Sequence, residues 1–140
     1  MAKQMQLVIF LAIASLFLSS FLVVSAHGHR DRRVHKGTAT FYTPPYLPSA
    51  CDEYKDEGVM IAAASHSIWN NGKACGKKLK VKCIGGTNDG PHPCRGKSHV
   101  TVKIVDFCPA GCQGTIDLSQ EAFAAIADPD AGKIKISFKQ

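Results

Sequence analysis

Short stretches in which apolar and polar residues alternate run through this chain, and each predicts a strand with one buried face. The alternation is clearest in residues 77–83, 100–105 and 133–140. Residues 37–43 are rich in threonine and aromatic side chains, and the apolar run 59–64 is typical of a fully buried strand. Short strands at roughly even spacing predict a mainly β protein, a small β-barrel.

A further short strand is expected around Asp117, and the one substantial helix follows it. Ser119 is a residue type that commonly caps helices, and Glu121 is favourably placed in the first turn, so we predict a helix through about Ala127. Only a single helical turn is expected elsewhere, at residues 66–69.

Two aspartates, Asp106 and Asp117, lie at the ends of predicted strands. Side chains at such ends tend to face a groove rather than a core, so we expect any functional groove to lie beside these carboxylates. Each aspartate also has a structural alternative. Asp117 could satisfy backbone amides at the start of the helix, and Asp106 could brace the turn at Cys108.

The first 26 residues have the pattern of a secretory signal peptide. Lys3 precedes an apolar run over residues 7–24, and small residues up to Ala26 form a cleavage site. The alternative is an uncleaved membrane anchor, because the run is almost long enough to span a bilayer. Cleavage would leave a secreted, extracellular protein with no integral membrane segment.

The remaining chain divides into a flexible basic arm, residues 27–36, and a single domain, residues 37–140. Cleavage after residue 26 would leave His27 as the free amino terminus, with His29 two positions later. A terminal amine and such a histidine can bind copper or nickel in a square plane. We regard this pair as a weak metal candidate and expect no cofactor.

Six cysteines follow the predicted signal: Cys51, Cys75, Cys83, Cys94, Cys108 and Cys112. An even count in a small secreted domain indicates three disulfides, and spacing alone leaves about 15 pairings open. A zinc site is disfavoured, because the CxxxC at the last two cysteines has no matching second pair or nearby histidine.

The chain is basic, with a formal net charge of +6. Outside the cell nucleic acid is not expected as a partner, and acidic wall polysaccharide or a membrane surface fits the charge better. Lys78, Lys80 and Lys82 form a stripe on the outward face of one predicted strand. Such a stripe is usually a solvated face, and lysines also protect a sheet edge from unwanted pairing.

Four motifs in order resemble the barwin–expansin superfamily of six-stranded double-psi β-barrels: ATFY (39–42), NGKACGKKLKVKC (71–83), VTVKIVDFC (100–108) and IDLSQEAFAAIA (116–127). Within it, the sequence is most similar to the plant natriuretic peptide group, also described as family-45-endoglucanase-like. The likeness covers Thr38 to Phe138. It implies the bridges Cys51–Cys75, Cys83–Cys94 and Cys108–Cys112.

In relatives of this superfamily a groove across the barrel binds a glucan. The resemblance places Thr40, Tyr42, Asp106 and Asp117 in that groove, with Asp117 at the position of the catalytic acid. The family's base lies just beyond the first strand, where this chain has Thr43-Pro44-Pro45 and no carboxylate. Inverting hydrolysis needs both groups, so the resemblance implies a protein that is not an enzyme.

The function expected from the resemblance is signalling from the apoplast that affects water and ion balance. We expect the protein to be a monomer. The segment from Tyr46 to Lys80 would be presented to a cell-surface receptor, because a loop clipped by a disulfide is cheaper to order on binding. Two alternatives use the groove instead: expansin-like binding or loosening of cell-wall polysaccharide, and barwin-like defence through microbial glycans.

Overall fold

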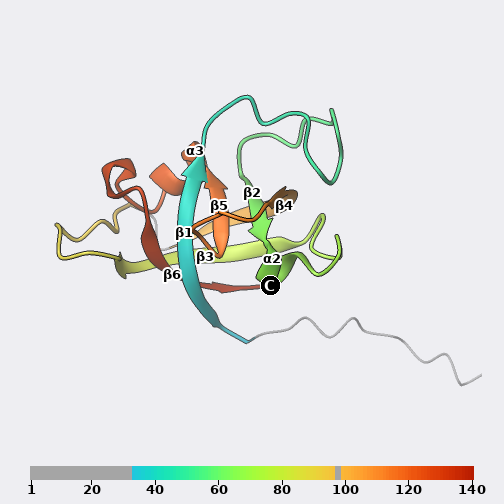
Figure 1. The fold of residues 1–140 in the computed structure, drawn as a ribbon. Helices are drawn as coiled ribbons and strands as arrows, with labels where there is room; N and C mark the ends of the chain where they lie inside the picture. Colours follow the sequence, from blue (N-terminus) through green and yellow to red (C-terminus); the bar gives the residue numbers. More distant parts are fainter. Residues whose placement is uncertain (1–32, 97–98) are drawn as a thin grey trace, which may run out of the picture.

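The computed structural model describes residues 33–96 and 99–140. Six strands close into a barrel (Figure 1). In order around the barrel they are β1 (His35–Tyr42), β5 (Ile116–Ser119), β2 (Ile61–Ser65), β4 (Val100–Cys108), β3 (Lys78–Gly86) and β6 (Ile134–Lys139). β1 pairs with β5, and β2 with β4, in parallel, whereas the other four pairings are antiparallel. The predicted double-psi β-barrel is confirmed.

The ends of three strands differ from the prediction. β1 begins at His35, because His35 and Lys36 pair with Phe138 and Ser137 of β6, so these two residues belong to the barrel and not to a flexible arm. β2 begins only at Ile61, and the two apolar residues before it are exposed. β3 continues to Gly86 through a register shift against β6. The predicted signal, the rest of the arm, and His27 and His29 lie outside the described residues.

Within the described residues, two short helices and one 3-10 turn accompany the strands: α2 (His66–Trp69), α3 (Gln120–Ala124) and η2 (Pro129–Ala131). Ser119 caps α3 as expected, because its Oγ accepts a hydrogen bond from the Ala122 amide at 3.2 Å. The helix is shorter than predicted. The backbone at Ile126 and Ala127 pairs instead with residues 94–95 of the neighbouring loop.

The core fills the barrel with the alternate residues that the pattern predicted to face inward. On β4, Val100, Val102 and Ile104 are all buried. Phe123 of α3 is fully buried and packs against Phe41 of β1, with ring centroids 4.9 Å apart. The second face of β1, which carries the polar residues of the predicted groove, is left on the outside.

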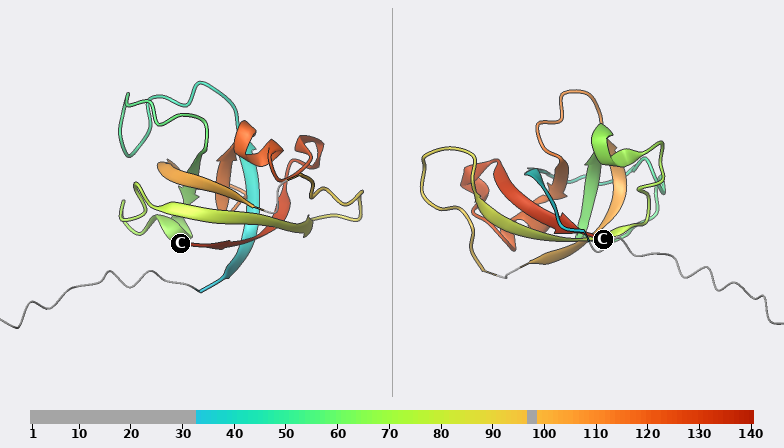
Figure 2. Two further views of the ribbon diagram at one scale, coloured as in Figure 1. Left: turned by 180° about the vertical axis from the view of Figure 1, so that it is seen from behind. Right: turned by 90° about the horizontal axis from the view of Figure 1, so that it is seen from below.

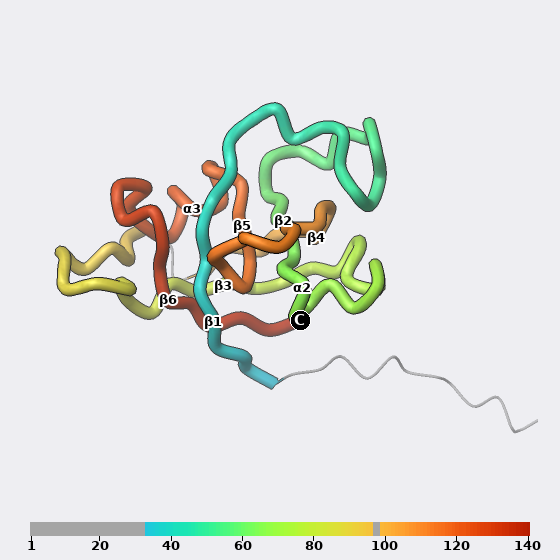
Figure 3. Tube along the Cα trace, in the orientation of Figure 1, coloured from blue at the N-terminus to red at the C-terminus, as the bar shows by residue number. Residues whose placement is uncertain are grey.

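All three disulfides have the pairing that the resemblance implied: Cys51–Cys75, Cys83–Cys94 and Cys108–Cys112. The long segment between β1 and β2, residues 43–60, rises above the barrel (Figure 3). The Cys51–Cys75 bridge ties this segment to the loop that precedes β3. In the view from behind, β3 crosses the barrel with β6 beside it (Figure 2).

Candidate functional site

One row of residues crosses four neighbouring strands and defines the predicted groove. Thr40 of β1 is the register partner of Asp117 on β5, Asp117 is the partner of Ala63 on β2, and Ala63 is the partner of Asp106 on β4. Register partners lie on the same face of a sheet. The two aspartates therefore flank an alanine, two strand spacings apart, with roughly 9–10 Å between their Cα atoms.

Asp117 is held by the threonine beside it. The Thr40 hydroxyl donates a hydrogen bond of 2.7 Å to Asp117 Oδ1. Burial raises the pKa of the Asp117 carboxyl, and the Thr40 hydrogen bond acts in the opposite direction. The carboxyl does not cap α3, since Ser119 performs that role. Asp117 is thus a half-buried carboxyl with a raised pKa, held by a hydrogen bond from the neighbouring strand.

Asp106 is held by two backbone amides. Its Oδ1 accepts hydrogen bonds from the amide of Phe107 at 2.8 Å and from the amide of Ala50 at 2.9 Å. The first contact braces the end of β4, as the structural alternative expected. The second ties the long segment before β2 to the barrel, so Asp106 also helps to set the position of the groove's upper wall.

Two tyrosines form that wall. Tyr42 lies two residues after Thr40 on the same face of β1, and its ring meets that of Tyr46 edge-on, with centroids 5.1 Å apart. The Tyr42 hydroxyl is buried and has no hydrogen-bond partner among the described residues. Burial and then the nearby charges of Asp106 and Asp117 raise its pKa. This hydroxyl therefore remains a proton-bearing donor beside both aspartates.

Tyr46 is anchored to the helix that follows the aspartate strand. Its hydroxyl donates a hydrogen bond of 2.6 Å to Glu121 Oε2. Burial and this hydrogen bond raise the pKa of Tyr46 to about 12, and the same bond lowers the pKa of Glu121. These two residues also line a hollow of about 340 Å³ between the long segment and the barrel. The residues of the predicted groove do not line this hollow. The charge of Glu121 is nevertheless among those that raise the pKa of Tyr42, so a third carboxylate lies beside the groove, where sequence reasoning did not place it.

Most of the acidic stretch 52–57 in the same segment is exposed, but Glu57 is largely covered. Only 16% of the Glu57 side chain is accessible, and it forms ion pairs with Lys55 and with Lys103 of β4, the latter at 2.8 Å. Lys103 and then Lys55 lower the pKa of Glu57 to about 2. The ion pair between Glu57 and Lys103 anchors the segment to β4, in addition to the contact between Ala50 and Asp106.

Sequence reasoning missed three residues of the groove: Ala63, Tyr46 and Glu121. Ala63 belongs to a continuous apolar run, and nothing in such a run distinguishes the inward from the outward residues. In the structure Ala62 and Ala64 pack in the core while Ala63 does not. Tyr46 follows two prolines in a segment whose path no local pattern fixes. Glu121 carried a signal only as a favourable residue of the helix's first turn.

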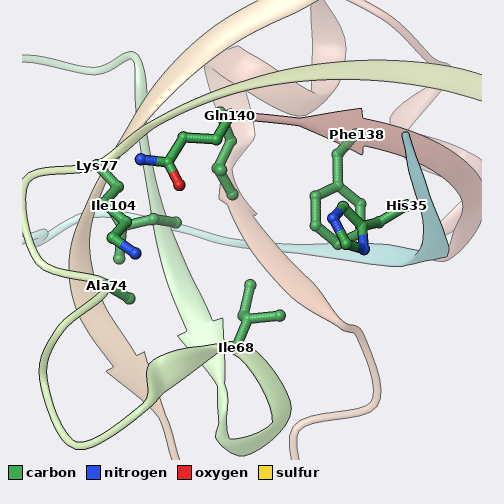
Figure 4. A pocket seen from close by; sticks show the side chains of 8 residues that line it. His35, Ile68, Ala74, Lys77, Ile104, Phe138 and Gln140 are labelled. Carbon is green, nitrogen blue, oxygen red and sulfur yellow. The ribbon is translucent and has the colours of Figure 1, made fainter. Parts of the chain in front are cut away.

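A second hollow, of about 150 Å³, lies at another end of the barrel and has a different character (Figure 4). The stacked rings of His35 and Phe138 lie on one side of it, and Ala74 and Ile104 on the other. The polar side chains of Lys77 and Gln140 also line it, whereas no acidic side chain does.

The described part of the chain adds two observations on ligands and membranes. Across residues 33–96 and 99–140, histidine, cysteine and acidic side chains form no group of three that could hold a metal ion. In the same residues no helix has the length and hydropathy needed to cross a membrane. The copper candidates His27 and His29 fall outside this range and stay a prediction.

Comparison with known proteins places this geometry in context. The sequence profile of the DPBB_1 family, described as lytic transglycolase, matches residues 61–138. An EG45-like domain containing protein from Citrus jambhiri is 74% identical over 106 residues, which cover 75% of this chain and 80% of that protein. The putative EG45-like domain containing protein 1 of Arabidopsis thaliana is 60% identical over 102 residues, 73% of this chain and 80% of the relative.

A solved structure shares the barrel. A point mutant of a Clavibacter michiganensis expansin, crystallised in complex with cellohexaose, superposes with a TM-score of 0.57 at 30% identity. The match covers 76% of this chain and 49% of the expansin, so the chain spans about half the length of that protein.

Proposed function

The chain belongs to the family of EG45-like domain containing proteins, and on that premise we propose that it is a secreted plant protein that binds a neutral β-linked glucan of the cell wall in the groove and does not hydrolyse it. The observation that carries this proposal is the row of Thr40, Asp117, Ala63 and Asp106 with two tyrosines above it. The bacterial expansin that shares the barrel binds cellohexaose, which supports a glucan as the ligand.

The groove offers the contacts that a sugar chain needs. Tyrosine rings present apolar faces to sugar rings, and carboxylates accept hydrogen bonds from sugar hydroxyls. Between the two aspartates lies Ala63, which is only 5% exposed, so the contacts that we propose for a ligand here come from Asp106 and Asp117.

The hydrogen bonds that the carboxylates already make support binding without cleavage. Hydrolysis with inversion needs an acid and a free carboxylate base that activates water. Asp117, with its raised pKa, fits the acid. Asp106 Oδ1 is engaged by two backbone amides and Glu121 Oε2 by Tyr46, while residues 43–45 hold no carboxylate. We therefore expect a protein that holds the chain without supplying a base.

Secretion to the cell wall is part of the proposal. The predicted signal and the three disulfides support it, because disulfides persist in oxidising compartments outside the cytosol.

A binding experiment with matched variants tests the groove. We expect retention on cellulose or xyloglucan, and a roughly tenfold to hundredfold loss for Asp117→Ala, because a hydrogen bond to a charged group contributes about 1.5–3 kcal/mol. Asp130→Ala is the control, since Asp130 is exposed on η2. Retention on no β-glucan, or equal loss in both variants, would overturn the proposal. Reducing ends released by wild type and not by Asp117→Ala would overturn its non-catalytic part.

A second candidate, signalling of the natriuretic type, is favoured by the upper surface of the long segment. Tyr54 there is 76% exposed, and the apolar Val59 and Met60 are exposed as well, on a loop clipped by a disulfide. Exposed apolar side chains on an ordered loop suit a protein partner. Protoplast swelling induced by wild type and lost with Tyr54→Ala would support this role. Swelling that persists unchanged in the variant would exclude this surface.

A further inference from the structure

Five lysines lie on the outer face of three neighbouring strands, away from the groove. We call this set the lysine face: Lys36 on β1, Lys135 and Lys139 on β6, and Lys80 and Lys82 on β3. All five are exposed. β6 lies between β1 and β3 in the barrel, so the face is continuous.

The register brings these charges close together. Lys80 is the direct partner of Lys139, and Ser137 lies between Lys36 on one side and Lys82 on the other. Neighbouring strands are about 4.8 Å apart, and alternate residues of one strand about 6.8 Å. Like charges directly opposite one another destabilise a sheet, so the fold alone gives no reason for this arrangement.

The two structural explanations offered by the sequence do not fit. Lysines protect exposed sheet edges, but β3 is paired with β4 and β6 in a closed barrel and has no free edge. An ordinary solvated surface has charges of both signs interspersed, which would place acidic side chains beside these lysines. Among residues 33–96 and 99–140, the ion pairs involve Lys55, Lys103 and Arg95 and none of the five lysines.

The face is also hollowed at its centre. A depression of about 280 Å³ is lined by three of these lysines and by no acidic side chain; its lining is Lys80, Lys82, Lys139, Ser137, His99, Val34 and Phe138. Sites for drug-sized ligands have about 300–1,000 Å³, so this depression suits one small unit of a longer molecule. The remaining lysines, Lys36 and Lys135, flank it on the neighbouring strands.

We propose that the lysine face, centred on this depression, binds a carboxylated polysaccharide of the polyuronate class. Lysines act as point charges that tolerate varied geometry, which suits a flexible chain of repeated carboxylates. A polymer engages several lysines at once, so weak exposed contacts add up. A membrane surface is a poorer fit, because the apolar part of the lining, Val34 and Phe138, is much smaller than the apolar face with which an amphipathic helix inserts into lipid. This surface is separate from the glucan groove and does not depend on it.

The test compares two double variants with the same change of charge. We expect the full chain, purified from a secreting host, to bind polygalacturonate at low salt and not its fully methyl-esterified form. Lys80→Gln/Lys139→Gln should weaken binding roughly five- to tenfold, since an exposed ion pair contributes up to about 1 kcal/mol and 1.4 kcal/mol is a factor of ten. Lys73→Gln/Lys77→Gln, in the loop before β3, should weaken it far less.

Three outcomes would overturn the proposal: no binding to polygalacturonate, equal weakening by both double variants, or tighter binding to phosphatidylserine vesicles than to polygalacturonate. Neutral glucan provides the check on the groove. Lys80→Gln/Lys139→Gln should leave retention on xyloglucan unchanged, and Asp117→Ala should leave polygalacturonate binding unchanged. The two surfaces can therefore fail independently.

Discussion

The groove and the lysine face lie on the outside of one barrel and share the strand β1, yet they are built in opposite ways. In the groove every carboxylate has a partner: Thr40 for Asp117, Ala50 for Asp106 and Tyr46 for Glu121. On the lysine face, Lys80 and Lys139 oppose each other directly, without a carboxylate partner among the described residues. The first surface is held in place by its own hydrogen bonds, whereas the second consists of exposed charges around a depression.

The difference predicts two modes of recognition. A preorganised groove selects by geometry and responds to pH, because the pKa of Asp117 is raised and that of Glu121 is lowered. A surface of solvated charges selects by charge density and responds to salt, because screening shortens the reach of exposed charges from about 10 Å at 0.1 M to about 3 Å at 1 M. A change confined to one of these surfaces should therefore leave binding at the other unaffected.

The largest effect is expected from removing the disulfide that anchors the long segment. Cys51–Cys75 spans 24 residues, and loop-closure entropy predicts that Cys51→Ala/Cys75→Ala lowers the free energy of unfolding by about 3.5 kcal/mol. The segment carries Tyr46 and Ala50, so glucan binding should fall as well. Polygalacturonate binding should persist, because β3 and β6 do not depend on this bridge. Urea denaturation and the two binding assays measure these effects.

Cys83→Ala/Cys94→Ala is the matched control. This bridge spans 11 residues, for which the same relation gives about 2.8 kcal/mol. It lies beside β3 and away from the groove, so glucan binding should be retained in conditions where the barrel stays folded. Loss of glucan binding in the control alone would contradict the division of the molecule into two independent surfaces.

Acid should weaken the ion pairs of Glu57, which anchor the wall of the groove. The pKa of Glu57 falls from 4.5 to about 2 on folding, so its ion pairs stabilise the folded state above about pH 4.5, and this contribution is lost as the pH falls toward 2. Glu57→Gln should therefore flatten the loss of thermal stability across this range. Melting temperatures of both proteins measured across the range test this, and an identical acid limb in the variant would contradict it.

Asp117 should show the opposite sign. Burial raises its pKa, so the folded state favours the protonated carboxyl, and its contribution to stability is fully present at low pH and is lost as the pH rises through the raised pKa. Asp117→Asn should raise the melting temperature at neutral pH and have little effect in acid. A lower melting temperature at neutral pH would instead show that the Thr40 hydrogen bond outweighs the cost of burying the charge.

Most of the barrel could be predicted from the sequence, because alternation of apolar and polar residues reports directly on which face is buried. Residues 100–105 are an example: three alternate apolar side chains fill the core as expected. The strand ends could not be predicted as well. Lys36 carries no apolar signal, and only its pairing with Ser137 brings it into β1. Disulfide pairing came from family resemblance, since spacing alone does not distinguish the possible partners.

The groove was less predictable, because it depends on register between strands far apart in sequence. Asp106 and Asp117 could be proposed from their positions at strand ends and from the resemblance. That Ala63 separates them follows only from the simultaneous pairing of β2 with β4 and β5. Likewise, the lysine stripe was visible on one strand, but the depression at its centre needs Lys139 from β6. Long-range pairing created both surfaces.

The smallest expected effect tests the comparison directly, because it measures how far repulsion within the lysine face lowers the free energy of unfolding. If Lys80 and Lys139 repel each other across β3 and β6, Lys80→Gln/Lys139→Gln should raise the free energy of unfolding by about 0.2–1 kcal/mol at low salt, the usual size of a cross-strand pair. The gain should vanish at about 1 M salt, where screening removes the repulsion. Urea denaturation at both salt concentrations measures it, with Lys73→Gln/Lys77→Gln as the control. A variant less stable than wild type at low salt would show that these lysines support the barrel, and the case for a binding surface would lose its energetic argument.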